Sequence, residues 1–195
     1  MDQTTLRCMI LAGSCSILIS AFPSTLSASC AYGTKVALVD GGAYELRAIE
    51  EIGFRDSVYA LVKGGEGPEW KPRGVRYSYG TGPAATDPGM IRVSFGSAES
   101  NSDITVTDRH IFLVMNNSPA NVILKRAIDL IPGADMLVDF HGNPVPVRSI
   151  TFITYRGGIH HVATSTNLDD RWEGHLIITN GIISADYLLQ LTYQE

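Results

Sequence analysis

Cysteine is scarce in this sequence. The 195 residues include three cysteines, and only Cys30 lies beyond residue 15. If residues 1–29 are removed, no second cysteine remains for an internal disulfide, which excludes a disulfide-stapled domain. Cys30 is then either a partner in an intermolecular disulfide or a functional thiol.

Clusters of basic residues and long apolar runs in the body of the chain are also lacking. The chain has 15 basic and 20 acidic residues, a net charge of −5, and no basic cluster that would neutralise a row of phosphates. Nucleic acid is therefore not an expected partner. After residue 29 no apolar run is long enough to cross a bilayer, so no stable membrane span is expected once the leader is removed.

Familiar catalytic and cofactor-binding signatures are missing as well. The sequence contains no GxSxG elbow, no phosphate-binding loop and no dinucleotide-binding fingerprint. We therefore expect no cofactor.

The N-terminus reads MDQTTLRCMILAGSCSILISAFPSTLSAS, with an apolar run from Cys8 to Phe22 that ends at Pro23. Small residues follow, among them Ser27 and Ser29, at positions that a signal peptidase reads. This layout predicts a signal peptide over residues 1–29 and a secreted protein. An uncleaved anchor is the alternative, but the run is short for a membrane span.

Residues 30–195 are enough for one compact domain. Short β-branched and aliphatic runs recur between turn residues, which predicts a mostly β, all-β fold with short helices. Hairpins are expected at His141-Gly-Asn143 and Asn180-Gly181. The expected short helices are Ala43 to Ile52 and Ala185 to Gln194. The expected strands are Thr34 to Val39, Ser57 to Lys63, Met90 to Phe95, Ile104 to Thr107, Ile111 to Met115, Asn121 to Leu124, Met136 to Phe140, Val145 to Thr154, Ile159 to Thr164, Leu176 to Thr179 and Ile182 to Ser184.

Gly64 to Gly89 differs from the rest of the body. It is dense in glycine and proline and poor in aliphatic residues. Because neither flank alone has enough strands to close a domain, residues 64–89 are predicted to be a long inserted loop rather than a linker.

Thr107-Asp-Arg-His110 lies between two short apolar runs. A tight bend there would direct the hydroxyl of Thr107 and the imidazole of His110 to one point, whereas a straight strand would place them on opposite faces. A thiol nucleophile needs a proton acceptor, and the amine it expels needs a donor; histidine serves either purpose near neutral pH. The alternative is that His110 caps the turn with Asp108 or Arg109.

The other histidines give weaker signals. His141 lies in an expected turn and should be exposed, and His175 stands at the start of a buried strand. His160 and His161 are neighbours on a strand and should point to opposite faces, without a further ligand at a suitable spacing. We therefore expect no metal site.

These pieces, taken in order, resemble a Hint domain, the self-processing module of hedgehog proteins and inteins. The matching stretches are Cys30-Ala-Tyr-Gly-Thr-Lys-Val36, Thr107-Asp-Arg-His110, Leu124 to Val138, Gly142 to Ile150 and Gly174 to Ile183. The resemblance implies that Cys30 attacks the carbonyl of the preceding residue, that Thr107 orients the scissile amide, and that His110 protonates the leaving nitrogen. It gives His175 a supporting role.

Three departures limit what the resemblance implies. Splicing members end in His-Asn, whereas Ala185 and Asp186 occupy the matching positions, so splicing is not expected. Nine residues follow Asp186, too few for the sterol-recognition region of hedgehog proteins, so cholesterol transfer is not expected. Upstream of Cys30 stands only the leader, where a released domain would be expected.

The predicted function is cysteine-mediated cleavage of the Ser29–Cys30 bond through a thioester that water or an added nucleophile resolves. The substrate would be the protein's own N-terminal peptide. Two alternatives remain open: a catalytically silent, secreted Hint-fold binding module that acts through the Gly64 to Gly89 segment, and a conventional secreted cysteine hydrolase.

Overall fold

The computed structural model describes residues 29–40, 43–65, 67–97, 99–116, 121–165 and 172–193. The predicted signal peptide, residues 1–29, lies outside this part of the chain except for Ser29. Within the described residues, no helix is both long and apolar enough to cross a membrane.

The described chain is almost entirely β-structure. Its elements are β1 (Cys30–Ala31), β2 (Lys35–Asp40), β3 (Ala43–Ala48), the 3-10 helix η1 (Ile49–Glu51), β4 (Ser57–Lys63), β5 (Pro68–Gly74), β6 (Tyr77–Gly80), β7 (Thr86–Gly96), β8 (Asn101–Thr107), β9 (Ile111–Met115), β10 (Val122–Arg126), the 3-10 helix η2 (Ala127–Asp129), β11 (Met136–Val138), β12 (Pro144–Arg156), β13 (Ile159–Ala163), β14 (Leu176–Thr179), β15 (Ile182–Ala185) and α1 (Tyr187–Thr192). The mostly β fold class predicted from the sequence is confirmed.

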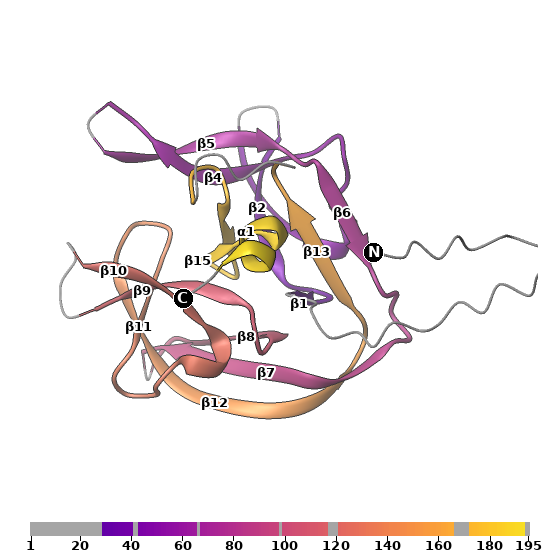
Figure 1. Cartoon of the computed structure of the whole chain (residues 1–195), viewed down its shortest axis with the longest axis vertical. Helices are drawn as coiled ribbons and strands as arrows, with labels where there is room; N and C mark the ends of the chain where they lie inside the picture. Colours follow the sequence, from indigo (N-terminus) through magenta and orange to yellow (C-terminus); the bar gives the residue numbers. More distant parts are fainter. Residues whose placement is uncertain are drawn as a thin grey trace, which may run out of the picture.

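The strands join into one antiparallel, strongly curved sheet (Figure 1). The main path runs β3-β2-β4-β14-β15-β9-β11-β12-β7-β8-β1-β13-β6, while β10 pairs with β9 and β5 with β4. The sheet brings the first described strand, β1, between β8 and β13, although β13 lies about 130 residues later in the chain.

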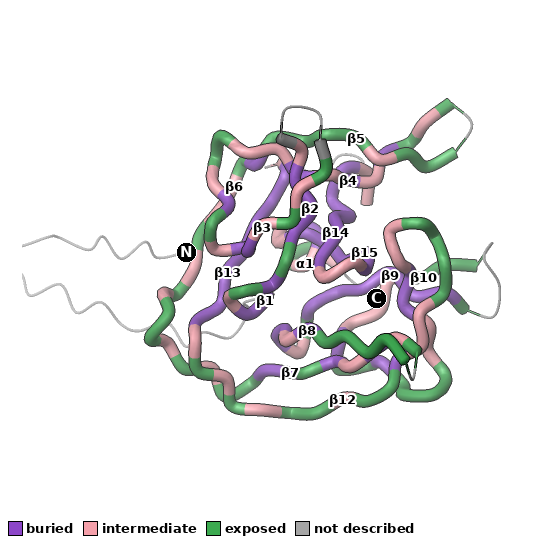
Figure 2. Tube along the Cα trace, turned by 180° about the vertical axis from the view of Figure 1, so that it is seen from behind, coloured by how far each residue is buried: buried purple, intermediate pink, exposed green. Residues whose placement is uncertain are grey.

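Side-chain patterns explain which strands lie inside. Along β4, burial alternates, with Val58, Ala60 and Val62 buried and the residues between them partly exposed. By contrast, every residue of β9, β14 and β15 is buried, as expected for apolar strands covered on both faces. Figure 2 shows the buried residues on these inner strands and the more exposed β12 and β5 along the outside.

The long strand β12 lets the sheet curve. It pairs with β7 along most of its length, with register shifts between Val147 and Ser149 and between Ile153 and Tyr155. Such bulges bend a strand and increase its twist. In Figure 1, β12 sweeps along one side of the molecule and leads into β13, which runs back beside β1.

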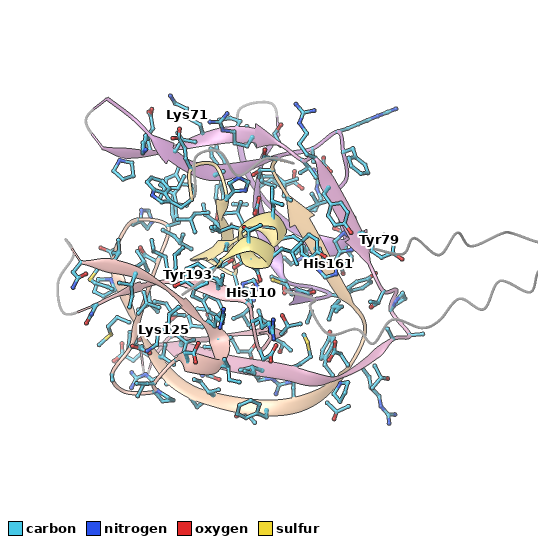
Figure 3. All side chains as sticks on the ribbon, in the orientation of Figure 1. Lys71, Tyr79, His110, Lys125, His161 and Tyr193 are labelled. Atoms are coloured by element: carbon cyan, nitrogen blue, oxygen red, sulfur yellow. The ribbon has the colours of Figure 1, made fainter. Side chains whose placement is uncertain are left out.

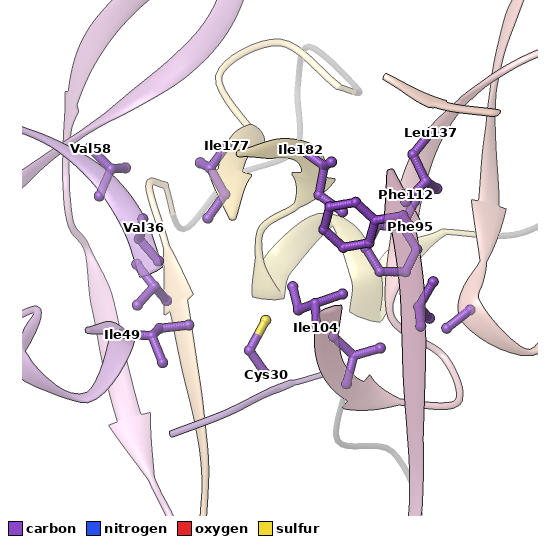
Figure 4. Packing of buried hydrophobic residues seen from close by; sticks show 14 of the residues in the cluster. Cys30, Val36, Ile49, Val58, Phe95, Ile104, Phe112, Leu137, Ile177 and Ile182 are labelled. Carbon is purple, nitrogen blue, oxygen red and sulfur yellow. The ribbon is translucent and has the colours of Figure 1, made fainter. Parts of the chain in front are cut away.

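The largest cluster of buried apolar side chains draws on both halves of the chain and includes Cys30 (Figure 4). Phe112, Val36 and Val58 have no exposed surface. Burial of one such side chain contributes about 1.5–3 kcal/mol to folding. The nucleophile candidate is therefore part of the main core.

The prediction of a long loop at residues 64–89 is wrong. This segment contains β5, β6 and the start of β7, and β5 pairs with β4 from Pro68 opposite Lys63 to Gly74 opposite Ser57. Both β5 and β6 have a single partner strand among the described residues. Proline is tolerated on such edges because a missing N–H interrupts no second ladder.

The predicted helix at Ala43 to Ile52 is also wrong. Ala43–Ala48 forms β3, paired with β2, and only Ile49–Glu51 turns into a 3-10 helix. Here the pairing partner overrides the helix-favouring composition of the segment. The second predicted helix, Ala185 to Gln194, is confirmed in shortened form as α1.

Both predicted hairpins are confirmed. β11 and β12 pair across the turn at His141-Gly-Asn143, and β14 and β15 pair across Asn180-Gly181. Asn180 and Gly181 both have positive φ, 48° and 83°. These are the backbone conformations that a tight two-residue hairpin turn requires.

Candidate active site

Cys30 opens β1, which is clamped between two longer strands. Its backbone lies opposite Val106 of β8 and His160 of β13. The side chain is 3% exposed, and Figure 4 shows its sulfur directed into the core beside Ile49 and Ile104. The thiol is therefore fixed in position and shielded from bulk water.

Thr107, the last residue of β8, holds the residue before the cysteine with two hydrogen bonds. Its backbone N–H donates to the Ser29 carbonyl oxygen at 3.0 Å, and its Oγ1 accepts from the Ser29 N–H at 3.0 Å. The Ser29 carbonyl is the group that Cys30 would attack. Thr107 thus holds the peptide before Cys30 through its side chain and polarises the Ser29 carbonyl through its main chain.

A tight turn separates Thr107 from His110, as predicted. The His110 N–H donates to the Thr107 carbonyl at 3.1 Å, and β9 begins at the next residue. The imidazole is 1% exposed and packs edge-on against Phe112 at a centroid distance of 4.9 Å. Its Nδ1 lies 3.8 Å from Cys30 Sγ, within hydrogen-bonding range for sulfur. Figure 3 shows His110 inside the molecule, below α1.

Burial keeps both groups uncharged. It raises the pKa of the Cys30 thiol to about 12. It also lowers the pKa of His110 to about 3, an effect that the neighbouring Gln190 side chain opposes. A neutral imidazole is the form that can accept a thiol proton.

A small cavity adjoins Cys30. Its volume is about 10 Å³, and its lining includes Cys30, His110, Gln190 and Tyr187. That volume is about the smallest that holds one water molecule.

His175 is not part of this group. It is 2% exposed, and its Nδ1 lies 3.0 Å from Asp186 Oδ2. Asp186 Oδ2 also accepts from the N–H and hydroxyl of Thr164, while Oδ1 accepts from the Leu189 N–H at the start of α1. His175 therefore lies behind Asp186, which itself lines the cavity beside Cys30.

The remaining histidines are divided between surface and core. His141 is exposed in its turn, as predicted. His160 and His161 are both buried; His160 Nε2 lies 2.8 Å from Ser78 Oγ, and His161 Nδ1 lies 2.7 Å from Ser29 Oγ. In the part of the chain that the structure describes, no three His, Cys, Asp or Glu side chains are grouped as metal ligands.

The sequence presents His161 only as a metal-ligand candidate and gives no sign of its contact with Ser29. The contact depends on the pairing of β13 with β1, and no local pattern in the sequence indicates that pairing. No local pattern in the sequence indicates that Tyr187 and Gln190 of α1 line the cavity either.

Comparison with known proteins identifies the fold. No family model and no curated protein matches the sequence. Solved structures do match, among them a bacterial intein-like domain from Clostridium thermocellum, with a TM-score of 0.58, 19% identity, and coverage of 81% of this chain and 97% of that one.

Two inteins give similar results. A DnaB intein from Synechocystis sp. PCC 6803 matches with a TM-score of 0.56 and 13% identity over 82% of this chain and 99% of its own. An intein from a hyperthermophile matches with a TM-score of 0.59 and 16% identity over 80% of this chain and 99% of its own.

The chain therefore has the Hint fold, the fold of inteins and intein-like domains. Within that fold, its Cys30 thiol lies against His110, next to a peptide carbonyl held by Thr107.

Proposed function

We propose that this chain is a secreted Hint-type autoprocessing protein that cleaves its own Ser29–Cys30 peptide bond without splicing. The observation that carries the proposal is the clasp of Thr107 on Ser29 combined with the His110 Nδ1 atom 3.8 Å from Cys30 Sγ. These contacts supply a nucleophile, a proton acceptor and a carbonyl-polarising donor at one peptide bond.

The first step is an acyl shift from nitrogen to sulfur. Cys30 Sγ attacks the Ser29 carbonyl carbon while His110 Nδ1 takes the thiol proton. The Thr107 N–H, 3.0 Å from the carbonyl oxygen, stabilises the negative charge that develops there. The carbon–nitrogen bond then breaks, His110 returns the proton to the Cys30 nitrogen, and a thioester joins the Ser29 acyl group to Cys30.

Water completes the reaction. Its oxygen attacks the thioester carbonyl, the carbon–sulfur bond breaks, and the products are a Ser29 carboxyl group and a free Cys30 thiol. The cavity beside Cys30, at about 10 Å³, has room for one water molecule and so supports water as the acceptor in the absence of an added nucleophile.

Two features support cleavage without splicing. Asp186 lies at the position matching the terminal asparagine of splicing members, and a carboxylate has no amide nitrogen to cyclise. Its oxygens are also occupied by His175, Thr164 and the Leu189 N–H. We propose that the asparagine cyclisation that completes splicing does not take place in this chain.

Secretion is the part of the proposal that rests on the leader sequence. A signal peptidase that cuts after Ser29 would leave Cys30 at the N-terminus, with no upstream bond to attack. Self-cleavage and signal removal therefore compete for one bond, and the leader is the peptide that this domain would release.

The experiment is the intact mass of the full chain carrying an N-terminal reporter, produced without exposure to signal peptidase. Wild type should release a fragment that ends at Ser29. Cys30→Ala should stay intact, and His110→Ala should cleave on the order of 10²–10⁴ times more slowly. His141→Ala, a change at an exposed turn, is the matched control and should cleave like wild type. Equal cleavage by wild type and Cys30→Ala would refute autoprocessing and leave the catalytically silent module.

A further inference from the structure

Ser29, the residue before the nucleophile, has an enclosed side chain. It is 2% exposed, and its hydroxyl is hydrogen-bonded to His161 Nδ1 at 2.7 Å. With the two backbone contacts to Thr107, this fixes Ser29 from both neighbouring strands: the backbone from β8 and the side chain from β13.

The imidazole of His161 is itself held in place. Its ring lies 4.4 Å from the ring of Tyr187 in α1, and Tyr187 stacks on Tyr77 of β6 at 5.2 Å with an interplanar angle of 13°. Figure 3 shows His161 on the side of α1 that faces β13. Because this aromatic pair backs the ring, the space beside Ser29 has a fixed size and a fixed polar group.

We propose that His161 is a specificity-determining residue that selects serine as the residue whose carbonyl Cys30 attacks. This inference rests on the proposed self-cleavage and adds which acyl residue the site accepts. A buried site built around a hydrogen bond discriminates against a side chain that lacks the bonding group. Alanine at position 29 loses the bond to His161, and leucine exceeds the space of a serine in a closely packed interior.

The contact also bears on the geometry of attack. A carbonyl held from two strands has less freedom to leave the approach line of the thiol, and small displacements of reacting atoms are costly. The contact of His161 is with the Ser29 hydroxyl, so we assign His161 an effect on the reaction through the position of Ser29, which makes it a positioning residue.

The test compares single-turnover cleavage of the reporter-fused full chain with serine, threonine, alanine or leucine at position 29, in wild-type and His161→Ala backgrounds. In the wild-type background, Ser29→Ala should slow cleavage on the order of tenfold, because one buried hydrogen bond is lost. Ser29→Leu should be slower still, and Ser29→Thr, which keeps the hydroxyl but adds one methyl group to a closed space, should have a rate between those of serine and leucine.

The decisive quantity is the serine-to-alanine rate ratio. It should fall to near one in His161→Ala and be partly kept in His161→Gln, whose side chain retains hydrogen-bonding groups. A purely structural role would lower all rates and leave the ratio unchanged, and that result would overturn the proposal.

The outcome does not depend on a single variant. If His161→Ala fails to fold, His161→Gln supplies the second background. A Ser29→Ala variant that cleaves at the wild-type rate would also overturn the proposal. Cys30→Ala, run in parallel, separates the two levels: cleavage by that variant would reject self-processing itself, whereas an unchanged rate ratio rejects only the role of His161.

Discussion

Cys30 and His110 form a pair of uncharged groups at neutral pH. Burial raises the pKa of the thiol to about 12 and lowers that of the imidazole to about 3. The thiolate that an ordinary cysteine enzyme prepares in advance is therefore disfavoured here. In the proposed mechanism the proton moves from Sγ to Nδ1 during the attack, over the 3.8 Å contact between them.

This pairing predicts a flat pH profile for the first chemical step. Between pH 5.5 and 8.5 neither group titrates, since this range lies above the pKa of His110 and below that of Cys30. The measurement uses hydroxylamine to intercept the thioester, at concentrations high enough that the cleavage rate no longer depends on the amount added. That rate should stay constant within about twofold over this pH range. A thiol that lost its proton to solvent before the attack would instead give a rise of about tenfold per pH unit, because the whole range lies below its pKa, and such a rise would contradict the account. Circular dichroism at each pH checks that the chain stays folded.

At the scale of elements, α1 closes the nucleophile's cavity, and Asp186 holds α1 in place. The Asp186 carboxylate caps the helix through the Leu189 N–H and joins it to His175 and Thr164 beneath. Tyr187 and Gln190, on the same helix, line the cavity. Asp186 thus serves in packing, with its carboxylate joined to the helix and to the residues beneath it.

Asp186→Ala should lower the free energy of unfolding by about 3 kcal/mol, because it removes a helix cap and leaves buried polar partners unpaired. Asp186→Asn should lose less, since asparagine also caps helices. Denaturant unfolding measures both. Asp129→Ala, at an exposed acid, is the control and should stay within about 0.5 kcal/mol of wild type. A loss that small for Asp186→Ala would contradict the assigned role.

At the scale of the whole molecule, the sequence indicates those strands and turns that depend on neighbouring residues alone. The apolar runs of β9, β14 and β15 and the hairpin at Asn180-Gly181 are recognisable because their signals lie within a few residues. The strands β5 and β3 are not, since proline-rich or helix-favouring segments become strands only when a partner strand is present. Long-range pairing has no local signal.

The candidate site divides in the same way. Cys30, Thr107 and His110 lie in recognisable motifs, and the turn between the last two was expected from their spacing. The contact of His161 with Ser29 required the pairing of Cys30 with His160, which joins residues 130 positions apart. The position of His175 behind Asp186 likewise follows from packing that no motif states.

The central claim is that Cys30 attacks the carbonyl of Ser29, and the acyl group itself gives the most direct test. The measurement is the intact mass of the fragment released from the reporter-fused full chain in neutral hydroxylamine. The account predicts a fragment that ends in a hydroxamate on Ser29 for wild type, and none for Cys30→Ala. The same hydroxamate from Cys30→Ala, or release at any other residue, would contradict it.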